Sequence, residues 1–106
     1  MLHQGKCLKI LQQIVAEVSP IKVLVFGSSV NGKPRANDLD FLIVIRDEAD
    51  PREIARNLYR KIDRNGISID LVVVTEGEYE MQRESFWSVV GVAQREGKEI
   101  YVAKTA

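Results

Sequence analysis

Three aspartates occupy positions where carboxylates are uncommon. Asp38 and Asp40 begin an apolar run that continues Phe-Leu-Ile-Val-Ile, and Asp70 lies inside a second run, Ile-Ser-Ile-Asp-Leu-Val-Val-Val. Carboxylates are seldom buried unless they are paired or bind a metal. Residues i and i+2 of a strand lie on the same face, about 6.5–7 Å apart along it. Asp38 and Asp40 are therefore predicted to project together.

The chemistry that suits these aspartates is metal-assisted phosphate transfer. If the two apolar runs form neighbouring strands, Asp70 comes beside the pair. Carboxylates this close repel one another, and desolvation adds to the cost of keeping them ionised. Mg²⁺ removes that cost, and it prefers a few carboxylates together with water and substrate phosphates. Two such ions, about 3.5–4 Å apart, can hold the attacking and leaving oxygens of an in-line displacement at phosphorus.

A Gly-Ser dipeptide supplies the second half of the predicted site. Gly27 and Ser28 follow an apolar run, and Gly32 lies in the polar link before Asp38. Glycine lets a phosphate approach the backbone, and N–H groups of a following helical turn can bind its oxygens together with the Ser28 hydroxyl. Each motif alone is more typical of a turn or a cap. Their combination in one short stretch favours a phosphate site.

The same stretch nearly matches a P-loop, G-x-x-x-x-G-K-[ST], from Gly27 to Lys33. Pro34 stands where the magnesium-binding Ser or Thr belongs. A P-loop also needs a long helix after its lysine, and the strand predicted from Asp38 leaves no room for one. The P-loop interpretation is therefore excluded.

Taken together, the motifs resemble the nucleotidyltransferase superfamily of DNA polymerase beta. They are most similar to the minimal nucleotidyltransferase domains of prokaryotes, called MNT proteins, and the likeness extends to Arg95-Glu96-Gly97 near the end of the chain. The resemblance implies that two Mg²⁺ ions bind and that ATP is the substrate. It assigns metal binding and catalysis to Asp38, Asp40 and Asp70, with Asp70 holding the catalytic ion. It assigns nucleotide binding to Gly27, Ser28, Ser29 and Gly32.

The resemblance also implies a partner. MNT proteins commonly pair with a small all-helical HEPN protein in toxin–antitoxin modules, and some are thought to transfer AMP to a tyrosine of that partner. Asn31 stands where many relatives carry arginine, and Asn37 where serine is common; neither change removes a metal ligand. Two alternatives stay open: a non-catalytic antitoxin that acts by binding its partner, and a regulatory nucleotide-binding module.

Composition limits the remaining function classes. The chain has 106 residues, which predicts a single domain over 1–106, and its 15 basic and 15 acidic side chains cancel. Extended nucleic-acid binding is therefore not expected. One cysteine fits a reducing compartment, and no signal peptide or membrane span is recognised, so a cytoplasmic protein is predicted. We expect the acceptor site to be completed by a partner or by a second copy of the chain.

Hydrophobic periodicity predicts the elements that position these residues. A helix is expected over 5–18, with an apolar stripe of Leu8, Leu11, Ile14, Val15 and Val18. Further helices are expected from Pro51 to before Gly66 and from Thr75 to about Arg95, the latter in two pieces. Strands are expected over 21–26, 38–45, 67–74 and 99–102, with a short helical turn after Ser28. At least one of Phe86 and Trp87 is expected in the core. This order predicts a small layered α/β (α+β) protein with three or four strands flanked by helices, and the resemblance implies that the sheet is mixed.

Overall fold

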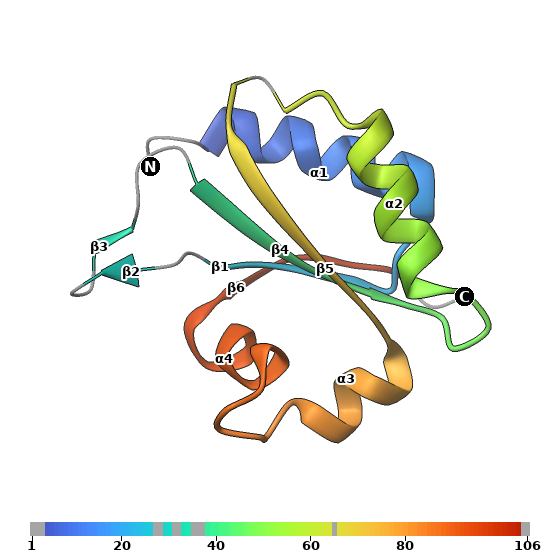
Figure 1. The fold of residues 1–106 in the computed structure, drawn as a ribbon, viewed down its shortest axis with the longest axis vertical. Coiled ribbons are helices and arrows are strands. Elements are labelled where there is room, and N and C mark those ends of the chain that lie inside the picture. The colour runs from blue at the N-terminus through green and yellow to red at the C-terminus, as the bar shows by residue number, and fades with distance from the viewer. Residues whose placement is uncertain (1–3, 27–28, 31–32, 35–37, 65, 105–106) are drawn as a thin grey trace.

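A computed structural model describes residues 4–26, 29–30, 33–34, 38–64 and 66–104, with residues 4, 29–30, 33–34 and 38 described by their backbone alone. The elements of this part of the chain, in order, are α1 (Gln4–Val18), β1 (Lys22–Phe26), β2 (Ser29–Val30), β3 (Lys33–Pro34), β4 (Asp38–Ile45), α2 (Pro51–Lys61), β5 (Ser68–Thr75), α3 (Glu76–Gln82), α4 (Val89–Glu96) and β6 (Lys98–Val102) (Figure 1). No helix in these ranges is long and apolar enough to cross a membrane.

Four strands form a mixed sheet in the order β5-β4-β1-β6. Strand β1 is antiparallel to β4 and to β6, whereas β4 and β5 are parallel and are joined through α2. A parallel pair needs a crossover connection, usually a helix, and α2 supplies it. The predicted α+β architecture and the predicted edge strand at β6 are confirmed.

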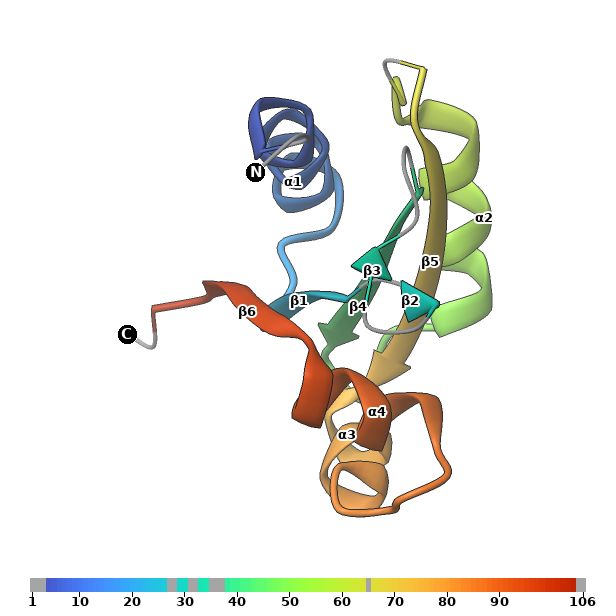
Figure 2. The same ribbon diagram turned by 90° about the vertical axis from the view of Figure 1, so that its left-hand side faces the viewer.

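Helices cover both faces of the sheet. Figure 2 shows α1 and α2 on one face and α3 and α4 on the other. Side chains alternate along β4: Phe41, Ile43 and Ile45 join the core beneath α1 and α2, while Leu42 and Val44 join the core against α3 and α4. All five are buried, which explains why β4 is apolar almost without interruption after Asp40.

Helix α1 packs through most of the predicted stripe, because Leu11 and Ile14 are buried and Val15 and Val18 pack against the same core. Ile10, Leu11 and Ile14 are buried, but Leu8 is 54% exposed. At 3.6 residues per turn, Leu8 lies about 200° round the helix from Ile10. The prediction that Leu8 belongs to the buried stripe was wrong, because Leu8 lies at the margin of that stripe and apolar spacing alone did not show how wide the buried side is.

Helix α2 begins and ends near the predicted residues. The Asp50 side chain accepts a hydrogen bond from the Arg52 N–H (3.0 Å), and Pro51 takes the first helical position. The helix ends at Lys61, because Ile62 is already extended. Gly66 does have a positive φ of 80°, but it lies in the turn before β5 rather than at the helix end.

The region after β5 forms two helices, as predicted. Thr75 and Glu78 make a capping box at the start of α3. The Ser88 side chain caps α4 by accepting from the Gly91 N–H. Between the two helices Phe86 and Trp87 are exposed by 61% and 88%. The prediction that at least one of them packs in the core was wrong, because the turn between α3 and α4 carries both rings away from the sheet.

The polar link between β1 and β4 differs from its prediction. Ser29–Val30 and Lys33–Pro34 pair as antiparallel strands, and no helical turn occurs at these four residues. In the sequence Asn31 and Gly32 stand between the paired residues Val30 and Lys33, although they lie outside the described residues. Asn-Gly is the preferred composition of a two-residue hairpin loop, a signal that the prediction of a helical turn overlooked. Gly27 and Ser28 lie outside the described residues.

Candidate active site

The register of the sheet brings two of the predicted carboxylates together. Asp40 of β4 pairs with Asp70 of β5 on one side and with Phe26 of β1 on the other. Neighbouring strands are about 4.8 Å apart, and paired residues point to the same face. The condition set by the sequence, that the strands of Asp40 and Asp70 be neighbours, is therefore met.

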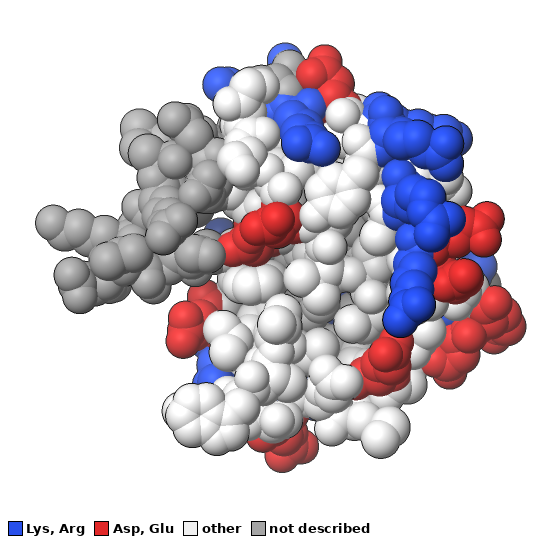
Figure 3. Space-filling model, viewed as in Figure 1, with Lys and Arg blue, Asp and Glu red and all other residues white. Residues whose placement is uncertain are grey.

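These two aspartates belong to the face covered by α3 and α4. Side chains of a strand point alternately to the two faces. Phe41, next to Asp40, and Ile69 and Leu71, on either side of Asp70, belong to the core beneath α1 and α2, so both aspartates point to the other face. Asp40 is buried, with only 8% of its surface exposed, and it is the charged residue that the described part of the chain buries. Asp70, in contrast, is exposed. Figure 3, in which the β5 edge of the sheet faces the viewer, shows acidic atoms next to the part of the chain that is not described. One carboxylate is thus anchored in the protein and the other opens to solvent.

The other predicted site residues are described in part or not at all. Asp38 begins β4, where its backbone pairs with Ser68, but its side chain lies outside the description. Ser29 is described only as backbone of β2. Gly27, Ser28 and Gly32 lie outside the described residues. Phe26, the partner of Asp40, is the residue before Gly27 in the chain.

The donor chemistry of this pair fits magnesium. Carboxylate oxygens are hard ligands of the kind that Mg²⁺ prefers, and facing Asp40 and Asp70 place two of them side by side. Two adjacent carboxylates, one of them buried, favour a cation that offsets their repulsion. Among residues with described side chains, no group of three His, Cys, Asp or Glu forms a metal site. Asp38 is not among those residues.

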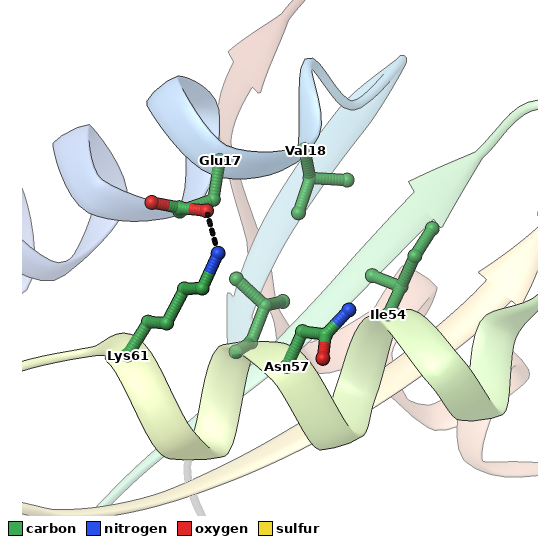
Figure 4. Close-up of a pocket in the computed structure, with 6 residues that line it drawn as sticks. Glu17, Val18, Ile54, Asn57 and Lys61 are labelled. Carbon is green, nitrogen blue, oxygen red and sulfur yellow. Dashed lines mark hydrogen bonds and ion pairs between the residues drawn. The ribbon is translucent and has the colours of Figure 1, made fainter.

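A shallow pocket between α1 and α2 is separate from this pair. It is lined by Glu17 and Val18 of α1 and by four residues of α2, Ile54, Asn57, Leu58 and Lys61 (Figure 4). Lys61 Nζ lies 3.3 Å from Glu17 Oε2 across it. Because α1 and α2 cover the opposite face from Asp40 and Asp70, this pocket is not part of the predicted phosphate site.

The lysine at the other end of β1 has a structural role. Lys22 Nζ lies 3.1 Å from Glu99 Oε2 and 5.0 Å from the centre of the Tyr79 ring. Burial lowers the pKa of Lys22, but the hydrogen bond with Glu99 and the charges of Tyr79 and Glu99 raise that pKa by more. Lys22 is five positions along the chain from Gly27 and joins β1, α3 and β6 rather than the aspartate pair.

One neighbour of the site was not predicted. Phe26 completes the row of paired residues across β1, β4 and β5 and packs against the core of α3 and α4. The alternation of β1, in which Leu24 and Phe26 share a face, could have shown this. That alternation does not reveal which strands are neighbours, so the pairing of Phe26 with Asp40 could be seen only in the structure.

Comparison with known proteins identifies the family. Searches with the chain match no curated protein and no solved structure. The family model described as polymerase beta, nucleotidyltransferase, matches residues 7–101, which include every strand of the mixed sheet but the last residue of β6, and both facing aspartates. The chain therefore belongs to the polymerase beta nucleotidyltransferase family.

Proposed function

We propose that the chain is a magnesium-dependent nucleotidyltransferase that transfers AMP from ATP to a tyrosine hydroxyl of a small all-helical HEPN toxin, acting as its cytoplasmic antitoxin. The observation that carries the proposal is the facing pair Asp40 and Asp70 in a chain of this family. The identity of the nucleotide, the acceptor and the partner are supported by the resemblance of the motif to MNT proteins.

The residues that would hold magnesium are Asp38, Asp40 and Asp70. When bound, the metal offsets the negative charge of the carboxylates and of the triphosphate and acts as a Lewis acid at phosphorus. Buried Asp40 gives this set a fixed ligand, because its backbone is paired on both sides within the sheet. Asp70 is exposed, so its carboxylate can be reached from solvent.

The reaction balances without any further reagent. The tyrosine oxygen bonds to the α-phosphorus of ATP, the bond from that phosphorus to the bridging oxygen breaks, and pyrophosphate leaves. The hydroxyl proton passes to solvent. Backbone N–H groups and hydroxyls of the polar link are proposed to bind the β- and γ-phosphates. The residues concerned are Gly27, Ser28, Ser29 and Gly32. This binding would hold the leaving group in line with the acceptor.

The test uses purified protein, a lysate of the native host and ATP labelled either at the α- or at the γ-phosphate, with Mg²⁺. We expect a labelled protein band with the α-label and none with the γ-label, because AMP transfer leaves the γ-phosphate in pyrophosphate. Asp40→Asn should remove the band, and its circular dichroism spectrum should show that it remains folded.

The matched control is Glu48→Gln, which removes an exposed acid outside the sheet. It should label as the wild type does. A band of undiminished intensity with Asp40→Asn would contradict the proposal. If Asp40→Asn forms no product but still silences the toxin, the protein is a non-catalytic antitoxin. Tight ATP binding without consumption would instead indicate a regulatory nucleotide-binding module.

A further inference from the structure

Exposed apolar side chains gather at the connection between α3 and α4. We call this set the aromatic patch: Met81, Phe86, Trp87 and Val89, which are exposed by 85%, 61%, 88% and 50%. Phe86 and Trp87 are in contact, and exposed apolar side chains that lie together mark a surface that binds another molecule. Tryptophan in particular is enriched among the residues that dominate binding energy at protein interfaces.

Two members of the aromatic patch, Phe86 and Trp87, are held in place by contacts with each other and with α4. The rings of Phe86 and Trp87 meet edge to face, with centroids 4.7 Å apart and planes at 78°. Arg95 lies with its guanidinium carbon 4.5 Å from the Phe86 ring centre and donates to the Phe86 carbonyl at 2.8 Å. Ser88 fixes the start of α4 by accepting from the Gly91 N–H at 2.9 Å. A preorganised surface loses little conformational entropy on binding.

The segment that carries the aromatic patch has a net negative charge, although the Arg95 guanidinium lies on the Phe86 ring. Residues 76–96 carry five acids and two bases, which gives a net charge of −3. Arg83 is already paired with Glu80 (3.5 Å), and Glu76 and Glu84 are exposed. A symmetric dimer that joined two copies of this patch would bring like charges together, which is unfavourable. The complementary surface is basic.

Such a surface is present on α2 of the same chain. We call it the arginine stripe: Arg52, Arg56 and Arg60, all exposed and spaced four residues apart, so that they lie along one side of the helix. Figure 3 shows basic atoms running along the position of α2. Residues 51–64 carry five bases and two acids, a net charge of +3. Among the described residues, Arg52 and Arg56 make no ion pair.

The two surfaces cannot meet within one chain. Helix α2 covers one face of the sheet, and α3 and α4 cover the other (Figure 2). We propose that copies of the chain associate head to tail, with the aromatic patch of one copy on the arginine stripe of the next. Trp87 packs against arginine guanidinium groups, a cation–π contact, and Glu84 supplies the opposite charge. This inference does not depend on the proposed function.

Sedimentation velocity of the full chain tests the association. We expect the mean mass to rise with protein concentration at low salt and to fall in about 1 M salt, where the Debye length is about 3 Å. Trp87→Ala and Arg56→Glu should each raise the dissociation constant about 10-fold or more. Val102→Ala and Lys104→Glu are the controls, because Val102 is the last residue of the edge strand β6 and Lys104 follows it, and both are exposed. Both variants should leave the dissociation constant unchanged.

A mixing experiment distinguishes head-to-tail contact from symmetric pairing. Trp87→Ala retains the arginine stripe and Arg56→Glu retains the aromatic patch, so an equal mixture should form dimers, and only dimers, although each variant alone is monomeric. Wild-type protein that stays monomeric at every concentration would overturn the proposal and leave the patch to a different protein. Loss of association in Trp87→Ala alone, with Arg56→Glu unaffected, would overturn it in favour of a symmetric dimer.

Discussion

Asp40 and Asp70 face each other across two parallel strands, yet one is buried and the other is exposed. That difference separates their expected roles. Asp40 lies between two paired strands and is fixed by the sheet, while Asp70 belongs to the edge strand β5. An exposed carboxylate can be changed with little effect on folding, typically within about 0.5 kcal/mol. Asp70 is therefore the better position for separating metal binding from stability.

The first prediction at this scale concerns Mg²⁺ alone. Added Mg²⁺ should raise the thermal unfolding midpoint of the wild type, because a ligand that binds only the folded state stabilises it. Each 1 kcal/mol gained corresponds to about 4–8 °C for a chain of this size. Asp70→Asn should respond much less, and Glu48→Gln should respond as the wild type does. Equal responses of the wild type and Asp70→Asn in differential scanning calorimetry would show that Asp70 is not a ligand.

A second prediction concerns pH and the Lys22–Glu99 pair. The pKa of Lys22 is raised in the folded protein above its value in the unfolded chain. The pair therefore stabilises the fold fully below the unfolded pKa, about 10.4, and that contribution is lost as pH rises through the folded pKa. Glu99→Gln should lower the free energy of unfolding by about 0.5–1 kcal/mol at pH 7.

The measurement for this pair is urea unfolding of the wild type and Glu99→Gln at pH 7 and above pH 10.5. The difference between the two proteins should shrink at the higher pH, because Lys22 is then losing its proton. A difference that is the same at both pH values would mean that Glu99 stabilises the fold through packing rather than through charge.

At the scale of elements, the turn between α3 and α4 depends on Gly91. A Cβ at this position would lie 1.8 Å from the Ser85 carbonyl oxygen, so the backbone would have to move. Gly91→Ala should destabilise the protein by about 1–3 kcal/mol, the usual cost of overpacking. Gly5→Ala is the matched control: nothing lies within 4 Å of its Cβ position in α1, and alanine there should stabilise by up to about 1 kcal/mol.

Chemical unfolding of both glycine variants measures these effects. Equal stability of Gly91→Ala and the wild type would mean that the α3–α4 connection can shift without cost. In that case the preorganisation of the aromatic patch, which relies on the same connection, would lose its support as well.

The sequence predicted most elements for identifiable reasons. The bounds of β4, the cap of α2 by Asp50 and the capping box of Thr75 and Glu78 all depend on local residues, and all are confirmed. The errors at Leu8, Trp87 and the β2–β3 pair have other causes. Exposure of Leu8 and Trp87 depends on how helices are oriented on the sheet, which local spacing does not determine. The β2–β3 pair carried a local Asn-Gly signal that was outweighed by the expectation of a helical turn.

For the whole molecule, the sequence indicated the aspartates but not their arrangement. The pairing of Asp40 with Asp70 depends on β4 and β5 being parallel neighbours, which is a property of the strand order. From the sequence it could be said only that Asp70 comes beside Asp40 if their two strands are neighbours. The alternation of β1 contained the position of Phe26, but its pairing with Asp40 again required the complete sheet. The family model covers residues 7–101 and so includes Phe26, Asp40 and Asp70.

For the molecule as a whole, we propose that the two ends of the polar link and the strand pair β4–β5 together form a metal-dependent nucleotide site. Binding of a non-hydrolysable ATP analogue, measured by isothermal titration calorimetry with and without Mg²⁺, tests it without any acceptor. Wild type, Asp40→Asn and Glu53→Gln would be compared, since Glu53 is an exposed acid of α2 on the opposite face. We expect binding that requires Mg²⁺ in the wild type and in Glu53→Gln and that is lost in Asp40→Asn. Undiminished, Mg²⁺-dependent binding by a folded Asp40→Asn protein would contradict it.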